Sequence, residues 1–116
     1  PSHTEAALLA ERTAVAPGGT LRLAVRLTMD SGWHTYWRNP GDAGGPTRLA
    51  WTLPAGWRAG EIGWPVPERI VAGPLVSYGY GGSVVLPVDV RAPADARPGD
   101  TVAVRVRASW IACADV

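Results

Sequence analysis

Apolar and polar residues alternate with a period of two along three segments of this chain, residues 21–28, 83–90 and 101–110. A period of two is typical of a β-strand that buries one face and exposes the other. We therefore expect three half-buried strands in these segments. Their expected buried sets are Leu21, Leu23, Val25 and Leu27; Val84, Leu86, Val88 and Val90; and Val102, Val104, Val106, Ala108 and Trp110.

Shorter apolar or aromatic runs, bounded by Gly and Pro, predict further strands at residues 5–13, 33–37, 48–53 and 75–80. Residues 38–46 are rich in turn-forming residues and are expected to form a loop. Residues 57–72 contain Pro65 and Pro67, which lack the amide hydrogen that a strand ladder requires. This segment is therefore expected to be an edge or an irregular crossing.

The number and spacing of these strands predict an all-β fold. We expect an immunoglobulin-like β-sandwich of about seven to nine antiparallel strands. Residues 1–116 have the length of one domain, and 47% of them are hydrophobic, which is enough for a core. A net charge of +1 gives no case for electrostatic binding of nucleic acid or of an anionic membrane.

The only cysteine of the chain is Cys113. Its thiolate can attack a disulfide, bind a soft metal or pair with a second cysteine. The structural alternative is that free cysteine often behaves as a small buried hydrophobe. Cys113 follows a long predicted strand, however, and reactive groups are often placed where a strand meets a loop. Asp115, two residues further on, is a candidate for proton transfer.

Residues 77–82, with the sequence SYGYGG, combine two tyrosines with three glycines. One interpretation is a tight hairpin turn whose tyrosines pack on a sheet. The other is a mobile flap, in which the glycines permit motion and a tyrosine covers a reactive sulfur. Composition alone does not connect this segment with Cys113.

Two of the six tryptophans of the chain flank His34, within residues 33–37. Tryptophan in a strand is usually largely buried, although exposed tryptophans could form a carbohydrate platform. A zinc site is not expected, because no second histidine lies at ligand spacing from His34. No Ser/His/Asp arrangement, phosphate-binding glycine loop or carboxylate pair stands out, and no cofactor is expected.

Four segments, in this order, resemble the N-terminal periplasmic domain of the thiol:disulfide interchange reductase family, which includes DsbD and its ScsB-like branch. They are residues 32–42 (GWHTYWRNPGD), 64–69 (WPVPER), 73–80 (GPLVSYGY) and 110–116 (WIACADV). The combination is more specific than any one segment and is closer to the ScsB-like branch. The resemblance implies a periplasmic immunoglobulin-like sandwich. In the full protein, this domain would be joined to a membrane domain and a thioredoxin-like domain.

The resemblance also implies which residues react. The family uses a pair of cysteines, and Cys113 matches the first of the two. The second is expected just after Val116, so that residues 1–116 form a single redox domain truncated at its C-terminal end. Asp115 and Glu68 are the candidates for proton handling. An aromatic cap loop shields the pair in the family, and the matching residues are Tyr78, Gly79, Tyr80 and Gly81.

The function that follows from the resemblance is periplasmic thiol–disulfide exchange. The domain would relay electrons from the thioredoxin-like domain of the same protein to periplasmic proteins, in disulfide reduction linked to cytochrome c maturation or copper tolerance. With one cysteine, residues 1–116 could form a mixed disulfide but not complete a two-electron cycle, so enzyme activity of these residues alone is left open.

Two other interpretations of the sequence remain. One is a non-catalytic sandwich that binds protein or sugar through exposed aromatics, with Cys113 in a structural role. The other is a copper-handling module in which Cys113 and Met29 supply soft sulfur ligands. One cysteine and one methionine are few for such a site.

Overall fold

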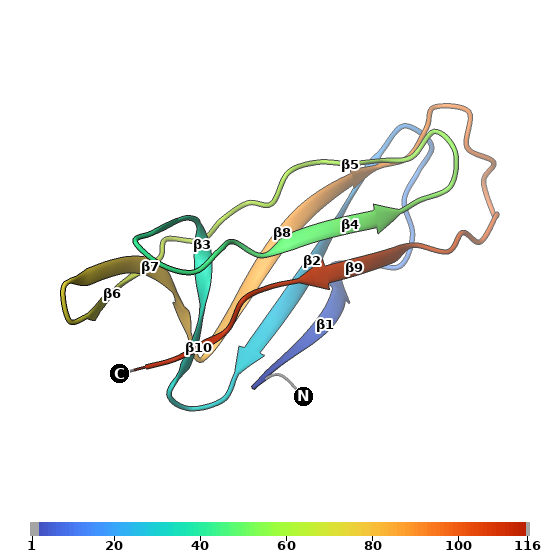
Figure 1. Cartoon of the computed structure of the whole chain (residues 1–116). Helices are drawn as coiled ribbons and strands as arrows, with labels where there is room; N and C mark the ends of the chain where they lie inside the picture. The colour runs from blue at the N-terminus through green and yellow to red at the C-terminus, as the bar shows by residue number, and fades with distance from the viewer. Residues whose placement is uncertain (1–2, 116) are drawn as a thin grey trace.

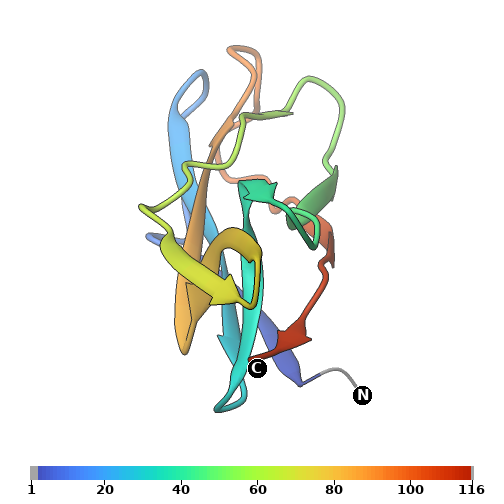
Figure 2. The same cartoon turned by 60° about the vertical axis from the view of Figure 1, so that its left-hand side comes forward.

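Ten antiparallel strands and their connections make up the computed structural model, which describes residues 3–115 (Figure 1). The strands form three sheets, and the described residues include no helix that could cross a membrane. The domain is elongated, with extents of 55 × 24 × 19 Å. The two views show the sheets packed face to face in two layers, as in an immunoglobulin-like sandwich (Figures 1 and 2).

The first layer is a four-stranded sheet with the order β1-β2-β8-β5. Its strands are β1 (Thr4–Ala10), β2 (Thr20–Met29), β8 (Ser83–Arg91) and β5 (Arg58–Ala59). The central pair, β2 and β8, runs in register from Thr20 opposite Arg91 to Thr28 opposite Ser83. The alternate apolar side chains of this pair form the core: Leu23, Val25, Leu27, Val84, Leu86, Val88 and Val90. The alternation predicted this face correctly, except that Leu21 is only partly buried.

The second layer contains two smaller sheets. One has the order β10-β3-β7-β6, and the other pairs β4 with β9. The strands are β3 (Trp33–Gly41), β4 (Arg48–Thr52), β6 (Glu68–Ala72), β7 (Leu75–Gly81), β9 (Arg105–Ser109) and β10 (Cys113–Ala114). Leu49 of β4 and Val106 of β9 pack on the core residues of β2 and β8, and so do Trp33 and Trp37 of β3 from the other small sheet. Both small sheets therefore cover the same apolar face of the first layer.

Every tryptophan of the chain contributes to this packing. Four of them pack against the core around Leu27 and Leu86, and two against the core around Val88 and Val90. They are Trp33, Trp37, Trp64 and Trp110 in the first group and Trp51 and Trp57 in the second. The core interpretation of the tryptophans is confirmed, and a platform of exposed tryptophans loses its basis.

The predicted fold class is confirmed, and the differences lie at strand ends. The structure has ten strands against the expected seven to nine, and the shortest are β5 and β10, which have two residues each and form beside longer partners. The loop expected from residue 38 begins later, because β3 continues to Gly41 through a register shift after Tyr36. The strand expected from residue 101 starts at Arg105, and Val102 is 39% exposed because nothing pairs with it.

Residues 60–67 cross from the first layer to the second, as the two prolines indicated. The amide of Gly60 donates to the carbonyl of Asp89 and the amide of Gly63 to the carbonyl of Pro87, both at 2.8 Å. The chain then leaves β8 and reaches β6 in the other layer (Figure 2). Tyr80 fixes the crossing from β7, because its hydroxyl donates to the Pro65 carbonyl at 2.8 Å.

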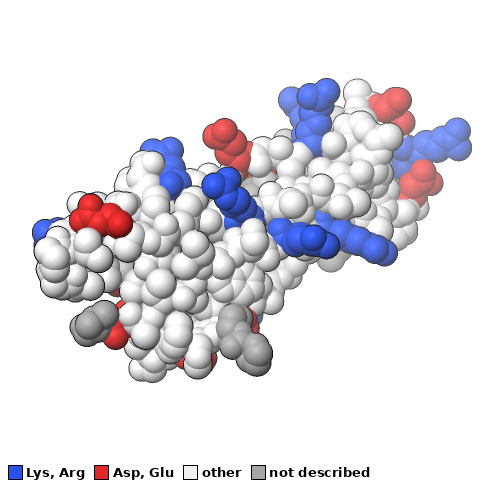
Figure 3. Space-filling model, in the orientation of Figure 1, with Lys and Arg blue, Asp and Glu red and all other residues white. Residues whose placement is uncertain are grey.

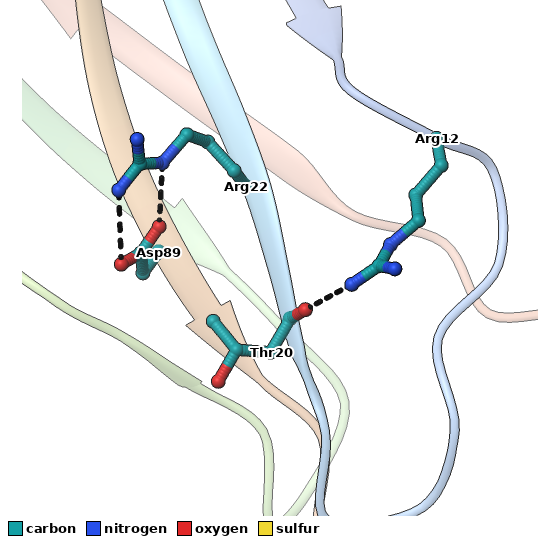
Figure 4. A network of polar contacts seen from close by, with 4 residues as sticks. All are labelled: Arg12, Thr20, Arg22 and Asp89. Atoms are coloured by element: carbon teal, nitrogen blue, oxygen red, sulfur yellow. Dashed lines mark hydrogen bonds and ion pairs between the residues drawn. The ribbon is translucent and has the colours of Figure 1, made fainter.

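The surface charges are distributed unevenly along the molecule. On the face shown in Figure 3, several arginines lie over the half that contains β4, β5 and β9, whereas the surface around β10 is largely uncharged. An exposed cross-strand ion pair joins β2 and β8, with Arg22 Nε 3.0 Å from Asp89 Oδ1 (Figure 4). Arg12 donates to the Thr20 carbonyl nearby, at 2.7 Å. These contacts stabilise the end of the sheet and lie away from Cys113.

Candidate functional site

Cys113 lies on the short strand β10, which pairs with the start of β3. Cys113 is opposite His34, and Ala114 is opposite Trp33. The amide of Asp115 extends the pairing by donating to the carbonyl of Gly32 at 2.6 Å. Two residue pairs and one further hydrogen bond thus fix the sulfur beside the histidine of β3.

The two faces of β3 carry different chemistry. Thr35 is fully buried, and Trp33 and Trp37 pack on the hydrophobic core. His34 and Tyr36 alternate with these residues, so their side chains lie on the opposite face and line a pocket together with Cys113. A strand with one core-facing and one pocket-facing side therefore holds two polar rings next to the sulfur.

A hydrogen-bonded chain connects Asp115, His34 and Tyr36. His34 Nδ1 is 2.6 Å from Asp115 Oδ1, and His34 Nε2 is 3.1 Å from the Tyr36 hydroxyl oxygen. An ionised carboxylate only accepts hydrogen bonds, so Nδ1–H donates to Asp115. In the neutral ring Nε2 is then an acceptor, and the Tyr36 hydroxyl donates to it. The His34 side chain is 8% exposed and that of Asp115 is 58% exposed.

Cys113 continues this chain on the other side of Tyr36. Burial raises the pKa of Tyr36, and a side-chain hydrogen bond with Cys113 and the charge of the cysteine raise it further. The Tyr36 hydroxyl therefore stays protonated between the sulfur of Cys113 and the imidazole of His34. The hydrogen bonds on either side of Tyr36 can therefore reverse their direction while its side chain stays a neutral hydroxyl.

Gly44 holds the Tyr36 ring in place. Its φ of +83° belongs to the left-handed region, and a Cβ at this position would collide with carbon atoms of the Tyr36 ring. The loop after β3 therefore lies directly on the ring, and only glycine permits this approach. Packing from this loop leaves the Tyr36 ring little freedom to move away from His34 and Cys113.

The pocket in front of Cys113 has a volume of about 400 Å³. Strands β6 and β7 form its opposite wall with charged and apolar side chains: Glu68, Arg69, Ile70, Val71 and Leu75. Cys113 itself is partly buried, neither open to solvent nor sealed in the core. A thiol in this position can be reached by a partner that enters the pocket.

The residues that matched the cap loop lie within strand β7 and not in a loop. A side chain at Gly79 would collide with the carbonyl oxygen of Thr35, so β3 and β7 approach closely there. Tyr80 is 6% exposed in the core, where burial raises its pKa to about 12. Tyr78 is in edge-to-face contact with Trp37, with ring centroids 6.3 Å apart. Of the four predicted residues, only Gly81 lines the pocket.

The β6–β7 hairpin also lines the pocket that contains Cys113. Its turn contains Gly73, with a φ of +59°, and open space surrounds that residue. Val71 and Leu75 flank the turn, line the pocket and are 54% and 44% exposed. The cap role that the resemblance gives to Tyr78–Gly81 stays a prediction, and the structure places these residues within a strand. The physical reason is that a Tyr-Gly alternation suits close packing between strands as well as a flexible turn.

The two candidates for proton handling are both in the pocket lining, in different surroundings. Asp115 is hydrogen-bonded to His34, whereas Glu68 lies on β6 and lines the pocket from that strand. Sequence reasoning did not select His34 or Tyr36. Their i, i+2 spacing on a predicted strand was a signal for a shared face, but the sequence did not indicate what that face meets.

Met29 and Cys113 are not brought together. Met29 is buried in the core, and its sulfur accepts a hydrogen bond from the Thr35 hydroxyl at 3.8 Å, on the other face of β3 from the pocket. Among residues 3–115, no three His, Cys, Asp or Glu side chains gather in a way that could hold a metal ion. The pair of soft ligands considered for copper is therefore not formed by this chain.

Comparison with known proteins decides the family. A family model described as "Thiol:disulfide interchange protein DsbD, N-terminal" matches residues 5–116. The chain belongs to the DsbD N-terminal family. The match to this family covers every strand except the first residue of β1, and it includes Cys113 and the pocket.

A solved structure supports the DsbD N-terminal fold. The crystal structure of the N-terminal periplasmic domain of ScsB from Proteus mirabilis aligns with a TM-score of 0.71 at 21% sequence identity. The alignment covers 100% of this chain and 42% of the ScsB chain, so the chain spans less than half of that structure. A comparison with curated protein sequences found no match.

Proposed function

We propose that this domain carries out thiol–disulfide exchange with Cys113 as its reacting group. Membership of the DsbD N-terminal family supports thiol–disulfide chemistry. The observation that carries the proposal is the position of Cys113, which is partly buried in a pocket between β10 and the β6–β7 hairpin, with the Tyr36 hydroxyl beside its sulfur. A purely structural cysteine would lie in the core and would not need such a pocket.

The reaction is a displacement at sulfur. The Cys113 thiolate attacks one sulfur of a disulfide in a partner protein, a new S–S bond forms, and the other sulfur of that disulfide leaves as a thiolate. A second thiol must then attack Cys113 to release the partner, which leaves with two more electrons while the domain becomes a disulfide. We propose that this second thiol is a cysteine just after Val116, as in the family to which the chain is similar.

The location and the partners follow from the same proposal. The relative from Proteus mirabilis is a periplasmic domain, and we propose the periplasm for this domain also. The electron donor would be a thioredoxin-like domain of the same protein, supplied through a membrane domain, and the acceptors would be periplasmic disulfide proteins. Cytochrome c maturation and copper tolerance are the processes in which such reduction would be used.

Covalent trapping tests the proposal. The chain is mixed with a thioredoxin-like domain whose single reactive cysteine carries a thionitrobenzoate leaving group. We expect one mixed disulfide on a non-reducing gel, with release of one equivalent of thionitrobenzoate. Cys113→Ser is the control and should give neither product. Equal thionitrobenzoate release from wild type and Cys113→Ser, or no mixed disulfide at all, would overturn the proposed function.

A further inference from the structure

Four side chains from two strands form one continuous polar path that ends at the sulfur. The path runs from the carboxylate of Asp115 to His34 Nδ1 and from His34 Nε2 to the Tyr36 hydroxyl, which lines the same pocket as Cys113 and whose pKa is raised by burial and by the cysteine. Cys113 and Asp115 lie on or next to β10, and His34 and Tyr36 lie on β3. The His34 side chain is 8% exposed, so water does not compete strongly for its ring nitrogens.

The path can hold one mobile proton in two positions. In the first state the Cys113 thiol donates to the Tyr36 oxygen, and the Tyr36 hydroxyl donates to the neutral His34 Nε2. In the second state His34 is protonated at Nε2 and donates to the Tyr36 oxygen, and the Tyr36 hydroxyl donates to the Cys113 thiolate. The two states differ by one proton moved from sulfur to nitrogen, and the Tyr36 oxygen remains a hydroxyl in both.

Two hydrogen bonds would stabilise the charges of the second state when it forms. The carboxylate of Asp115 faces the imidazolium across 2.6 Å and stabilises its positive charge. The thiolate receives the Tyr36 hydrogen bond in a partly buried position. The other charged groups that face the pocket are Glu68 and Arg69 of β6, whose opposite charges offset each other. From β7 only uncharged residues line it.

We propose that Tyr36 and His34 form a proton relay for Cys113. Asp115 positions His34 in this relay and faces the positive charge that His34 carries when it holds the proton. This inference deepens the proposed function and rests on it. The relay takes the thiol proton when Cys113 attacks a partner disulfide, and it returns that proton to the sulfur that leaves the partner. Tyr36 is the catalytic residue of the relay because its hydroxyl is the member of the path that shares the pocket with the reacting sulfur, whereas His34 acts through Tyr36 and Asp115 acts through His34.

The test measures how fast iodoacetamide alkylates Cys113 across the range from about pH 6 to about pH 10, without any partner protein. Tyr36→Phe keeps the ring that Gly44 contacts and removes only the hydroxyl. We expect alkylation to slow about tenfold near neutral pH and to recover toward the wild-type rate at the alkaline end, where hydroxide removes the thiol proton directly. A change that only disturbed the packing would slow alkylation at every pH.

Further variants separate the members of the relay. His34→Gln should reproduce the neutral-pH loss, and Asp115→Asn, which keeps an acceptor for Nδ1–H but not the charge, should give a smaller loss. The matched controls are His3→Gln, since His3 is the other histidine of the chain, and Tyr78→Phe, whose ring contacts Trp37 outside the pocket. Both controls should keep the wild-type profile, and circular dichroism identifies any variant that fails to fold.

The outcomes distinguish the relay from the proposed function. If Tyr36→Phe and His34→Gln fold and keep the wild-type pH profile, the relay is wrong even when the mixed disulfide with the thioredoxin-like domain forms. If the two variants lose alkylation near neutral pH but the wild-type chain forms no mixed disulfide, the relay is supported and the proposed function is overturned. If the loss is equal at all pH values, the residues only pack and the relay is wrong.

Discussion

The β2–β8 pair and the β3–β10 pair differ in their length and in the kind of side chains that they bring together. The first is a long register from Thr20–Arg91 to Thr28–Ser83, with alternate Leu and Val side chains buried beneath it. The second has two residue pairs, and the side chains that it brings together are a thiol, an imidazole and a carboxylate. Burial of apolar area holds the first pair, and a few hydrogen bonds hold the second.

The difference shows how one small domain separates stability from reactivity. A core side chain such as Leu86 is fully buried and contributes to stability through its packing contacts, whereas Cys113 is only partly buried, as the proposed function requires of a thiol that a partner must reach. Strand β10 adds few contacts of its own and depends on β3, which is fixed from the core side by Trp33, Thr35 and Trp37. Changes in the two regions should therefore have separable effects.

The largest expected effect is at the core. Leu86 is 0% exposed, and Leu86→Ala should lower the free energy of unfolding by about 3–5 kcal/mol, because it removes buried methyl groups and leaves a cavity. Urea unfolding followed by tryptophan fluorescence measures the loss. The alkylation rate of Cys113 in the folded protein should not change. Leu8→Ala is the control, since Leu8 is 45% exposed and should cost about 1 kcal/mol or less. Equal losses of stability in Leu86→Ala and Leu8→Ala would contradict the prediction that the buried residue of β8 contributes more than the exposed residue of β1.

A smaller effect, on both the stability of the domain and the reactivity of Cys113, is expected at Gly44. Gly44→Ala would place a methyl group against the Tyr36 ring and strain a φ of +83°, at a cost of about 2 kcal/mol. Because the ring must move, alkylation of Cys113 near neutral pH should slow as well. The matched control is Gly82→Ala, with a φ of +69° and no heavy atom within 4 Å, which should cost about 1 kcal/mol and leave alkylation unchanged. Identical behaviour of the two variants would show that the loop does not hold Tyr36.

The smallest effect concerns alkaline pH. Burial raises the pKa of Tyr80 from its ordinary value of 10.0 to about 12, so the unfolded chain releases this proton first. The stabilisation that comes from burying the neutral Tyr80 hydroxyl is fully present below pH 10. As the pH rises toward 12, the free energy of unfolding falls by up to about 2 kcal/mol. No lysine titrates in this range, because every basic residue other than histidine is arginine.

The measurement is urea unfolding of the wild type and Tyr80→Phe at several values between about pH 9 and about pH 12. Tyr80→Phe should be less stable at neutral pH, because it loses the hydrogen bond to the Pro65 carbonyl, and it should show a shallower decline at high pH. Tyr36, whose pKa is also raised, should account for part of the remaining decline. Tyr78→Phe is the matched control. Identical alkaline declines in the wild type and Tyr80→Phe would contradict the prediction.

Particular residues show how far prediction from the sequence reached. The buried sets of β2 and β8 followed from alternation, because a period of two determines which side chains share a face. The strands β5 and β10 were not predictable, since two residues carry no periodicity and pair only where a neighbour presents a free edge. The resemblance placed a cap loop at Tyr78–Gly81, whereas the close approach of β3 at Gly79 makes that segment part of a sheet.

The sequence by itself determined the β-sandwich class, the core of Leu, Val and Trp side chains and the family motifs, and it led to the prediction that Cys113 is the reactive residue. Its reacting atom would be the sulfur. The tertiary structure alone decided what surrounds that atom. Asp115 and His34 are 81 positions apart, and only the pairing of β10 with β3 brings them to 2.6 Å and places Cys113 beside Tyr36. The physical reason is that side-chain periodicity acts over a few residues and determines a face, whereas the partner of that face depends on which distant strand edge the folded chain leaves free.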